Sequence, residues 1–259
     1  MNTTVEQLQS LKLFGILDAW VEQQSLPSYH DLSFDERLAL LVEREHLRRA
    51  HLRQQRRLKA AQLPLAATSA SLSSIDYSRP RGLTKAQVLN WAQGHWLTQH
   101  LQLILVGPTG IGKTFLASSL ATHLCQIGHT VAYFKTHDLL TELKLARADG
   151  SFLKLRKRLD GVELLILDEW LRDALSVNDA RELLDLLDSR YRKRSCLFAT
   201  QLPLEQWHAQ IQDPTLADAI LDRIAHDSMH LSLRGESMRK LTSPLNHQNP
   251  NLIKPETQD

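Results

Sequence analysis

Eight consecutive residues have the types and spacing of a phosphate-binding loop. They follow the pattern Gly-x-x-x-x-Gly-Lys-Thr and read Gly107-Pro108-Thr109-Gly110-Ile111-Gly112-Lys113-Thr114. Glycines in such a loop let backbone N–H groups turn towards phosphate oxygens, and the N-terminus of the following helix adds positive potential. We expect Lys113 to reach the β- and γ-phosphates of ATP and to act in catalysis. Thr114 would coordinate Mg²⁺ through its hydroxyl, and Phe115 would belong to the same nucleotide site.

A second candidate for phosphate chemistry is the apolar run at residues 164–167, which ends in the acids Asp168 and Glu169. A carboxylate at the end of a buried strand can hold Mg²⁺ directly or through water, so we expect Asp168 to be the second metal-binding side chain. Glu169 would polarise a water molecule beside the γ-phosphate. That role favours ATP hydrolysis over transfer of the phosphate to a small-molecule acceptor.

The elements that must position these residues alternate along the chain from residue 84 onward. We expect strands at residues 101–106, 130–134, 163–167, 195–200 and 229–233, and helices at residues 113–126, 137–148, 152–159, 179–192 and 218–226. Several of the strand segments are almost continuously apolar, which is typical of a parallel sheet covered on both faces. The pattern predicts an α/β fold.

The regions outside this pattern differ from it in composition and in predicted structure. Residues 1–63 predict a small all-helical N-terminal domain, with one long helix at residues 35–59 that Ser33 and Glu36 would cap. Residues 64–83 indicate a linker, and residues 84–242 form the predicted ATPase domain. Residues 243–259 are polar and rich in proline, which predicts a disordered tail.

Composition excludes several classes of protein. The net charge is only +2, and Cys125 and Cys196 lack any C-x-x-C partner, so we expect two buried thiols rather than a disulfide framework or a zinc site. The histidines show no metal-ligand spacing either, so Mg²⁺ is the metal that we expect. The N-terminus does not resemble a signal peptide, and no apolar run approaches the length of a membrane span. We therefore expect a cytoplasmic protein without a membrane partner.

Two segments concentrate positive charge. On the predicted helix at residues 35–59, four arginines fall near one face, namely Arg49, Arg53, Arg56 and Arg57. A second cluster consists of Lys154, Arg156, Lys157 and Arg158, which Lys144 and Arg147 would extend. Such clusters suit contacts to DNA phosphates without base readout. For the arginine stripe, a solvated helix face or a protein-contact surface is the alternative.

Beyond these motifs, the chain resembles the IstB-like AAA+ ATPases, helpers of bacterial insertion-sequence transposases and relatives of the helicase loader DnaC. The resemblance covers nearly the whole chain and is carried by residues 31–45, 143–152, 189–195, 200–226 and 233–240, together with the phosphate loop. One stretch departs from the pattern. The family usually has Asp-Trp-Gly where this chain has Glu169-Trp170-Leu171.

The resemblance implies an AAA+ fold, a P-loop NTPase core with a RecA-like five-stranded parallel sheet. In this sheet the strand at residues 195–200 would lie between the phosphate-loop strand and the Asp168 strand. Gln201 would then be a catalytic polar residue near the γ-phosphate. Arg223 would be an arginine finger on the ATP of a neighbouring subunit, and Arg239 would contact the nucleotide of its own subunit. The second basic cluster would face a central channel that holds DNA.

The function that follows is an ATP-dependent helper of transposition. A homo-oligomer would assemble on duplex DNA with little sequence preference and deliver the target to a transposase, and ATP hydrolysis would drive release or remodelling. A DnaC-like replicative helicase loader would share every catalytic residue and differ only in its partner. A phosphate loop would also suit a small-molecule kinase, or a DNA-coating protein that binds ATP without hydrolysing it.

Overall fold

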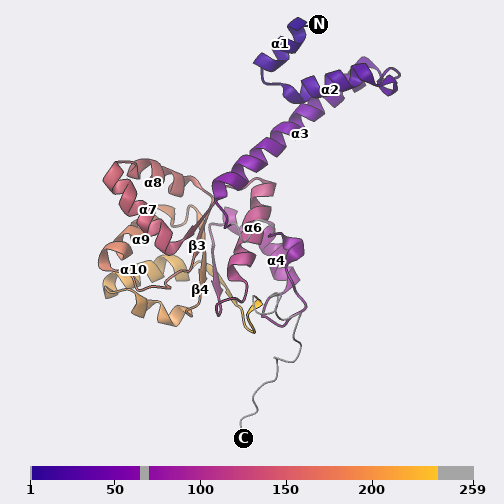
Figure 1. The fold of residues 1–259 in the computed structure, drawn as a ribbon. Helices are drawn as coiled ribbons and strands as arrows, with labels where there is room; N and C mark the ends of the chain where they lie inside the picture. The colour runs from indigo at the N-terminus through magenta and orange to yellow at the C-terminus, as the bar shows by residue number, and fades with distance from the viewer. Residues whose placement is uncertain (1, 65–69, 239–259) are drawn as a thin grey trace, which may run out of the picture. The chain divides into compact units, whose positions relative to one another are not determined.

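The computed structural model describes residues 2–64 and 70–238 (Figure 1). The chain divides into two compact units, residues 1–57 and residues 58–259, and each is described by itself. None of the helices in the described part combines the length and apolar character that a bilayer crossing requires.

The first unit contains α1 (Asn2–Ser10), α2 (Phe14–Ser25), a short 3-10 helix (Pro27–Tyr29) and most of α3 (Phe34–Ala61). The Ser33 N–H donates to Glu36 Oε2 at 2.8 Å and the Glu36 N–H donates to Ser33 Oγ at 3.4 Å, which confirms the predicted cap. At Gly15 the backbone of α2 lies against α3, and a Cβ there would be 2.7 Å from the Glu45 Cα. Only glycine fits this close approach.

The second unit is built on one parallel sheet. Its strands are β1 (Gln102–Val106), β2 (Val131–Lys135), β3 (Leu164–Asp168), β4 (Ser195–Thr200) and β5 (Ser228–Ser232), in the order β2-β3-β4-β1-β5. β4 therefore lies between the phosphate-loop strand and the Asp168 strand. The predicted α/β AAA+ fold and the predicted place of β4 in the sheet are confirmed.

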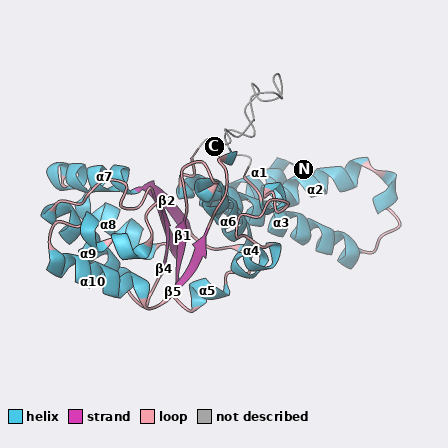
Figure 2. Ribbon diagram, turned by 90° about the horizontal axis from the view of Figure 1, so that it is seen from below, coloured by secondary structure: helices cyan, strands magenta, loops and turns pink. Residues whose placement is uncertain are grey.

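Helices cover both faces of this sheet (Figure 2). One face carries α4 (Lys85–Ala92), α5 (His95–Thr98) and α6 (Lys113–Ile127), and the other carries α7 (Thr136–Asp149), α8 (Phe152–Gly161), α9 (Val177–Arg190) and α10 (Pro214–Ala225). Leu103 and Leu105 belong to the hydrophobic cluster on the first face, whereas Ile104 between them belongs to the cluster on the second. This alternation is the period of a strand.

Short 3-10 helices complete the described fold, at Leu72–Ser74, Leu204–Gln206 and His208–Gln210. The two cysteines lie on opposite faces, Cys125 in the first cluster and Cys196 in the second. Both are free and buried, as the sequence predicts.

Three helices differ clearly from the prediction. Helices α4 and α5 have no counterpart among the predicted elements, although the Thr84 hydroxyl accepts from the Gln87 N–H in a capping box that marks the start of α4. Helix α10 begins at Pro214, four residues earlier than predicted, because Asp213 caps it and proline at the first helical position is preset for a helix.

Candidate nucleotide-binding site

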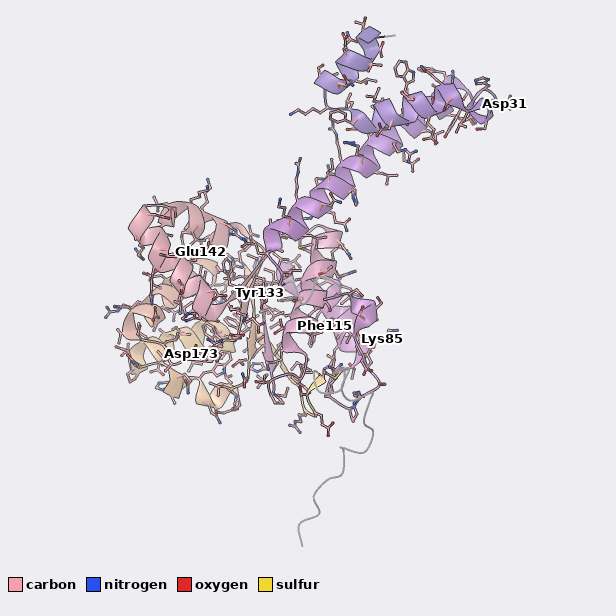
Figure 3. The ribbon with its side chains drawn as sticks, viewed as in Figure 1. Asp31, Lys85, Phe115, Tyr133, Glu142 and Asp173 are labelled. Atoms are coloured by element: carbon pink, nitrogen blue, oxygen red, sulfur yellow. The ribbon has the colours of Figure 1, made fainter. Side chains whose placement is uncertain are left out.

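The phosphate loop lies at the edge of the sheet where the parallel strands end. It connects the end of β1 at Val106 to the start of α6 at Lys113. A cavity of about 780 Å³ opens here, a size typical of small-molecule sites. It is lined by loop residues, by the acids at the end of β3, by Gln201 after β4 and by Phe115 on α6. Figure 3 labels Phe115 on this helix.

The loop has the backbone that its glycines predict. Gly110 has a φ of 82°, in the region that favours glycine, and a Cβ there would collide with the Ser237 hydroxyl. The buried Lys113 Nζ donates to the backbone carbonyls of Gly107, at 2.6 Å, and Pro108, at 3.0 Å. The ammonium group is therefore held inside the loop that the sequence predicts to bind phosphate.

The two predicted metal-binding side chains touch each other. The Thr114 hydroxyl donates to Asp168 Oδ2 at 2.6 Å, and Asp168 is buried. Hydroxyl and carboxylate oxygens are hard ligands that suit Mg²⁺ beside nucleotide phosphates, so the residues present fit the ion. In the described residues, no group of three or more His, Cys, Asp or Glu side chains gathers as another metal site.

Asp168 has further hydrogen bonds that no sequence motif indicates. The Tyr133 hydroxyl donates to Asp168 Oδ2 at 2.7 Å, and the Glu169 N–H donates to Oδ1 at 2.8 Å. Burial and the charge of Asp168 raise the pKa of the Tyr133 phenol, so its hydroxyl stays a donor at neutral pH. The Thr136 hydroxyl donates to the Asp168 carbonyl at 3.1 Å.

The side chain of Glu169 is held by two cations. Lys135 Nζ lies 2.9 Å from Glu169 Oε1, and the Arg172 guanidinium donates to Oε2. The hydrogen bond and the charge of Glu169 raise the pKa of Lys135 above its ordinary value. Lys135 does not stand out in the sequence, because its position becomes meaningful only once β2 is known to pair with β3. Arg172 is local to the acid, three residues after Glu169 in the same loop.

The loop after β3 is fixed to β4. The Trp170 N–H donates to the Ala199 carbonyl at 2.9 Å, and the Thr200 hydroxyl donates to the Trp170 carbonyl at 2.8 Å. The buried Trp170 ring packs against Phe198 and Trp207. At the position where the family usually has glycine, Leu171 has a φ of 53° and is 1% exposed. The leucine thus adopts the left-handed conformation that glycine reaches more readily.

The sides of the cavity come from segments that the sequence did not assign to the site. Residues 74–76 precede the core, in the segment predicted as a linker, and line the cavity together with Arg81 and Leu83. Arg81 Nη1 donates to the Ile111 carbonyl at 3.1 Å. After β5, the Met238 N–H donates to the Gly110 carbonyl at 2.9 Å. Local sequence signals for these contacts are weak, since both segments are irregular.

Gln201 follows β4 directly and is exposed at the cavity, between the phosphate-loop strand and the Asp168 strand. The position of the Gln201 side chain suits the predicted catalytic role, and that role stays a prediction. Arg239, the other residue predicted to contact the nucleotide of its own subunit, lies outside the described residues.

Arg223 lies at the opposite edge of the sheet. It is in the last turn of α10, shortly before β5 starts at Ser228, and Ser228 pairs with the first residue of β1. Arg223 Nε donates to Asp188 at 2.8 Å, and Nη1 lies 3.2 Å from Asp222. One strand of about 16 Å separates this edge from the phosphate loop, so Arg223 does not belong to the cavity of its own chain.

Most of the cations predicted to bind DNA on α7 and α8 have partners. The ion pairs join Lys144 to Asp179 at 2.7 Å, Arg147 to Glu182 at 2.6 Å and Arg156 to Asp160 at 3.2 Å, and Arg158 donates to Gln62 at 2.5 Å. Lys154 and Lys157 are exposed and form no ion pair with any described residue. Fewer cations of this cluster are therefore available to bind DNA phosphates than the sequence suggests.

The arginine stripe of the first unit lies on α3 as predicted. Arg49 pairs with Glu45 at 2.6 Å, and Arg53 and Arg56 are exposed on the same helix. Arg57, the last residue of this unit, is half-buried. The four arginines therefore lie on one helix as expected, and their contacts with DNA stay a prediction.

A phosphate loop after β1, acids at the end of β3 and a strand order with β4 between them define an ATP-binding protein of the AAA+ class. The sequence profile of the IstB-like ATP binding proteins matches residues 6–245. The chain belongs to this family.

Relatives support the same assignment. A Sinorhizobium fredii protein named as insertion sequence ATP-binding protein y4pL is 37% identical over 239 residues, which are 92% of this chain and 96% of the relative. The IS1162 ATP-binding protein of Pseudomonas fluorescens is 42% identical over 200 residues, 77% of this chain and 86% of the relative. The crystal structure of the DnaC helicase loader matches with a TM-score of 0.54 at 19% identity, over 66% of this chain and all of that chain. The last likeness shows the fold alone.

Proposed function

We propose that this protein is an ATPase that helps an insertion sequence to transpose. A homo-oligomer assembles on duplex DNA when ATP is bound, delivers the DNA to a transposase, and is released or remodelled by hydrolysis. The observation that carries the proposal is the contact between Thr114 and Asp168 beside the phosphate loop, with Glu169 as the next residue. A site that binds ATP without hydrolysing it would need no second acid at this place.

Binding would use donors that are already in position. Backbone N–H groups at the start of α6 and the Lys113 ammonium would hold the phosphates, and Lys113 would exchange its two carbonyl acceptors for phosphate oxygens. Thr114 and Asp168 would hold Mg²⁺, which when bound neutralises charge on the phosphates. Ile75 and Leu83 offer apolar surface at the same cavity for the base.

Hydrolysis would require Glu169 to accept a proton from water. Its carboxylate oxygens now face Lys135 and Arg172, and both ion pairs are partly open to solvent, so each contributes little to stability and can exchange. Gln201, at the tip of β4, would orient the same water. Arg223 of a neighbouring subunit would supply a further cation at the γ-phosphate.

Contact with DNA would involve α8 first. Lys154 and Lys157 are exposed on this helix, and so is Leu153 beside them in sequence. The cations on α7 would add less, because their ion pairs with α9 must break before they can bind phosphate. Phosphate contacts of this kind carry no sequence information, which agrees with a low target preference.

The names of the relatives favour transposition over the loading of a helicase. The similar proteins are named for insertion sequences, whereas the DnaC likeness is at the level of fold. A kinase is disfavoured because Glu169 adjoins Asp168 at the cavity and would activate water rather than exclude it.

The test is phosphate release by the purified full chain with ATP and Mg²⁺, with and without duplex DNA and without any small-molecule acceptor. We expect phosphate release that needs no acceptor and whose rate differs when DNA is present. We also expect sedimentation to show assembly on DNA that requires ATP. Capture of the transposase encoded by the same element, but not of a replicative helicase, would support the partner. Bound ATP without any release would favour a DNA-coating protein instead.

A further inference from the structure

A buried tyrosine from strand β2 reaches the acid that we assign to Mg²⁺. Tyr133 lies opposite Ile166 in the parallel register of β2 and β3, two residues before Asp168 on the same face of β3. The Tyr133 ring belongs to the hydrophobic cluster on the α6 face, and its hydroxyl donates to Asp168 Oδ2. Figure 3 labels this residue. Two elements, α6 through Thr114 and β2 through Tyr133, thus hold one carboxylate oxygen.

The hydrogen bonds leave unequal capacity on the two oxygens. Each oxygen of an ionised carboxylate accepts about two hydrogen bonds. Oδ2 already accepts from the Thr114 and Tyr133 hydroxyls, at 2.6 and 2.7 Å. Oδ1 accepts from the Glu169 N–H at 2.8 Å and keeps a lone pair. The carboxylate cannot turn without losing both hydroxyl donors.

We propose that Tyr133 is a positioning residue for metal binding: by filling Oδ2, it fixes Asp168 so that Oδ1 keeps its free lone pair for Mg²⁺ or a water on the ion. Tyr133 acts through Asp168, because Tyr133 is not among the residues that line the cavity. The inference rests on the proposed use of ATP with Mg²⁺.

A structural role for the same hydroxyl makes a different prediction. A buried tyrosine needs an acceptor, and losing the bond could simply loosen the core and weaken nucleotide binding under every condition. A positioning role changes only the part of the affinity that depends on metal. Comparison of binding with and without Mg²⁺ therefore separates the two.

The experiment compares the full-length wild type with Tyr133→Phe, which keeps the ring and removes the hydroxyl. Binding of the fluorescent analogue mant-ATP is measured in EDTA and across a range of Mg²⁺ concentrations. We expect metal-free affinity within about twofold of wild type, and a Mg²⁺ midpoint raised about tenfold, the size of a lost hydrogen bond to a charged acceptor. Thermal unfolding without nucleotide checks that the variant is folded.

The matched control is Tyr191→Phe, because it makes the same chemical change between α9 and β4, where the Tyr191 hydroxyl has no hydrogen bond to a described residue. It should leave the Mg²⁺ midpoint unchanged. In an Asp168→Asn background, Tyr133→Phe should cause no further change in the midpoint, since its effect passes through the carboxylate.

Two outcomes would overturn the inference while the proposed function stands. These are a wild-type Mg²⁺ midpoint in Tyr133→Phe, or an equal loss of affinity with and without metal. A wild-type protein that binds no mant-ATP at any Mg²⁺ concentration would overturn the proposed function and this inference together.

Discussion

The cations at the two ends of the parallel strands have different partners. Where the strands end, Lys113 and Arg81 donate to backbone carbonyls of the phosphate loop around a cavity. Where the strands begin, Arg223 forms ion pairs with Asp188 and Asp222, away from that cavity. The first arrangement is a binding site within one chain. The second is a surface whose proposed catalytic use requires another copy of the chain.

Because of this difference, we expect that some substitutions will change ATP hydrolysis without changing ATP binding. Every residue proposed to bind the nucleotide, apart from Arg239, lies at the first edge in one chain. The proposed finger Arg223 lies at the second edge. Substitutions at the first edge should therefore act at any protein concentration, and substitutions at the second should act only where subunits meet.

Lys113→Ala should have the largest effect, the loss of tight ATP binding and with it all hydrolysis. The side chain supplies the main positive charge inside the loop, where charge-assisted hydrogen bonds to phosphate are strong. Nucleotide titration at physiological Mg²⁺ measures the effect. Lys193→Ala removes an exposed lysine at the other edge and serves as the control. Near-wild-type affinity of Lys113→Ala would remove the phosphate-loop assignment.

Arg223→Ala should leave ATP binding intact and slow hydrolysis by about 10³, the lower end of the range for an arginine finger. Hydrolysis by the wild type should rise with protein concentration and with DNA long enough for several subunits. Mixing Arg223→Ala with Lys113→Ala protein should restore some activity, because one brings the intact cavity and the other the intact finger.

Asp188→Asn separates this role from the ion pair. It removes the charge of Asp188, the nearer of the two ion-pair partners of Arg223 at 2.8 Å, and keeps the guanidinium, so hydrolysis should stay near the wild-type rate. Equal losses in Arg223→Ala and Asp188→Asn would indicate a structural ion pair instead of a finger. Co-assembly of the mixed proteins must be shown by sedimentation before absence of rescue is interpreted.

Glu169→Gln should preserve ATP binding and slow hydrolysis by about 10², the scale of a lost general base. The ATP-bound assembly on DNA should persist longer as a result. Single-turnover hydrolysis with excess protein is the measurement. Asp173→Asn, an exposed acid in the same loop that pairs with Arg172, is the matched control. Unchanged turnover in Glu169→Gln would assign the activation of water to another group.

Reversal of Lys154 and Lys157 to Glu should have the smallest effect, a loss of DNA affinity of about tenfold at low salt for every duplex alike. The salt dependence should become shallower, because fewer counterions are released. The control reverses Lys85 and Lys193, two exposed lysines on other elements. A loss confined to one DNA sequence would contradict phosphate contacts.

The sequence predicted the strands of the core closely, because buried parallel strands are apolar along their whole length and end in polar turns. The contact between Thr114 and Asp168 could also be expected, since the phosphate-loop and acid motifs sit at fixed places in the fold. Arg81 and Tyr133 could not. Each becomes part of the site only through pairing or packing with segments distant in sequence, and neither belongs to a local pattern.

The basic cluster shows the opposite error. The positive charges of α7 and α8 are visible in the sequence, but the placement of Asp179 and Glu182 of α9 opposite Lys144 and Arg147 is not. Partners of this kind are set by tertiary packing. Charge density along a chain therefore overestimates the charge available to a polyanion.

The packing of Trp170 provides an optical signal beside Glu169, the acid that we propose to activate water. Its indole follows Glu169 directly, is buried, and lies 4.9 Å from the Phe198 ring and 5.8 Å from the Trp207 ring, centroid to centroid. Indole emission shifts to longer wavelength when the ring meets water, and energy transfer between two such close indoles depends on their orientation. Movement of Glu169 away from Lys135 and Arg172 would disturb this environment. The difference in intrinsic fluorescence between the wild type and Trp170→Phe would thus report, without any label, when the loop rearranges during an ATP cycle.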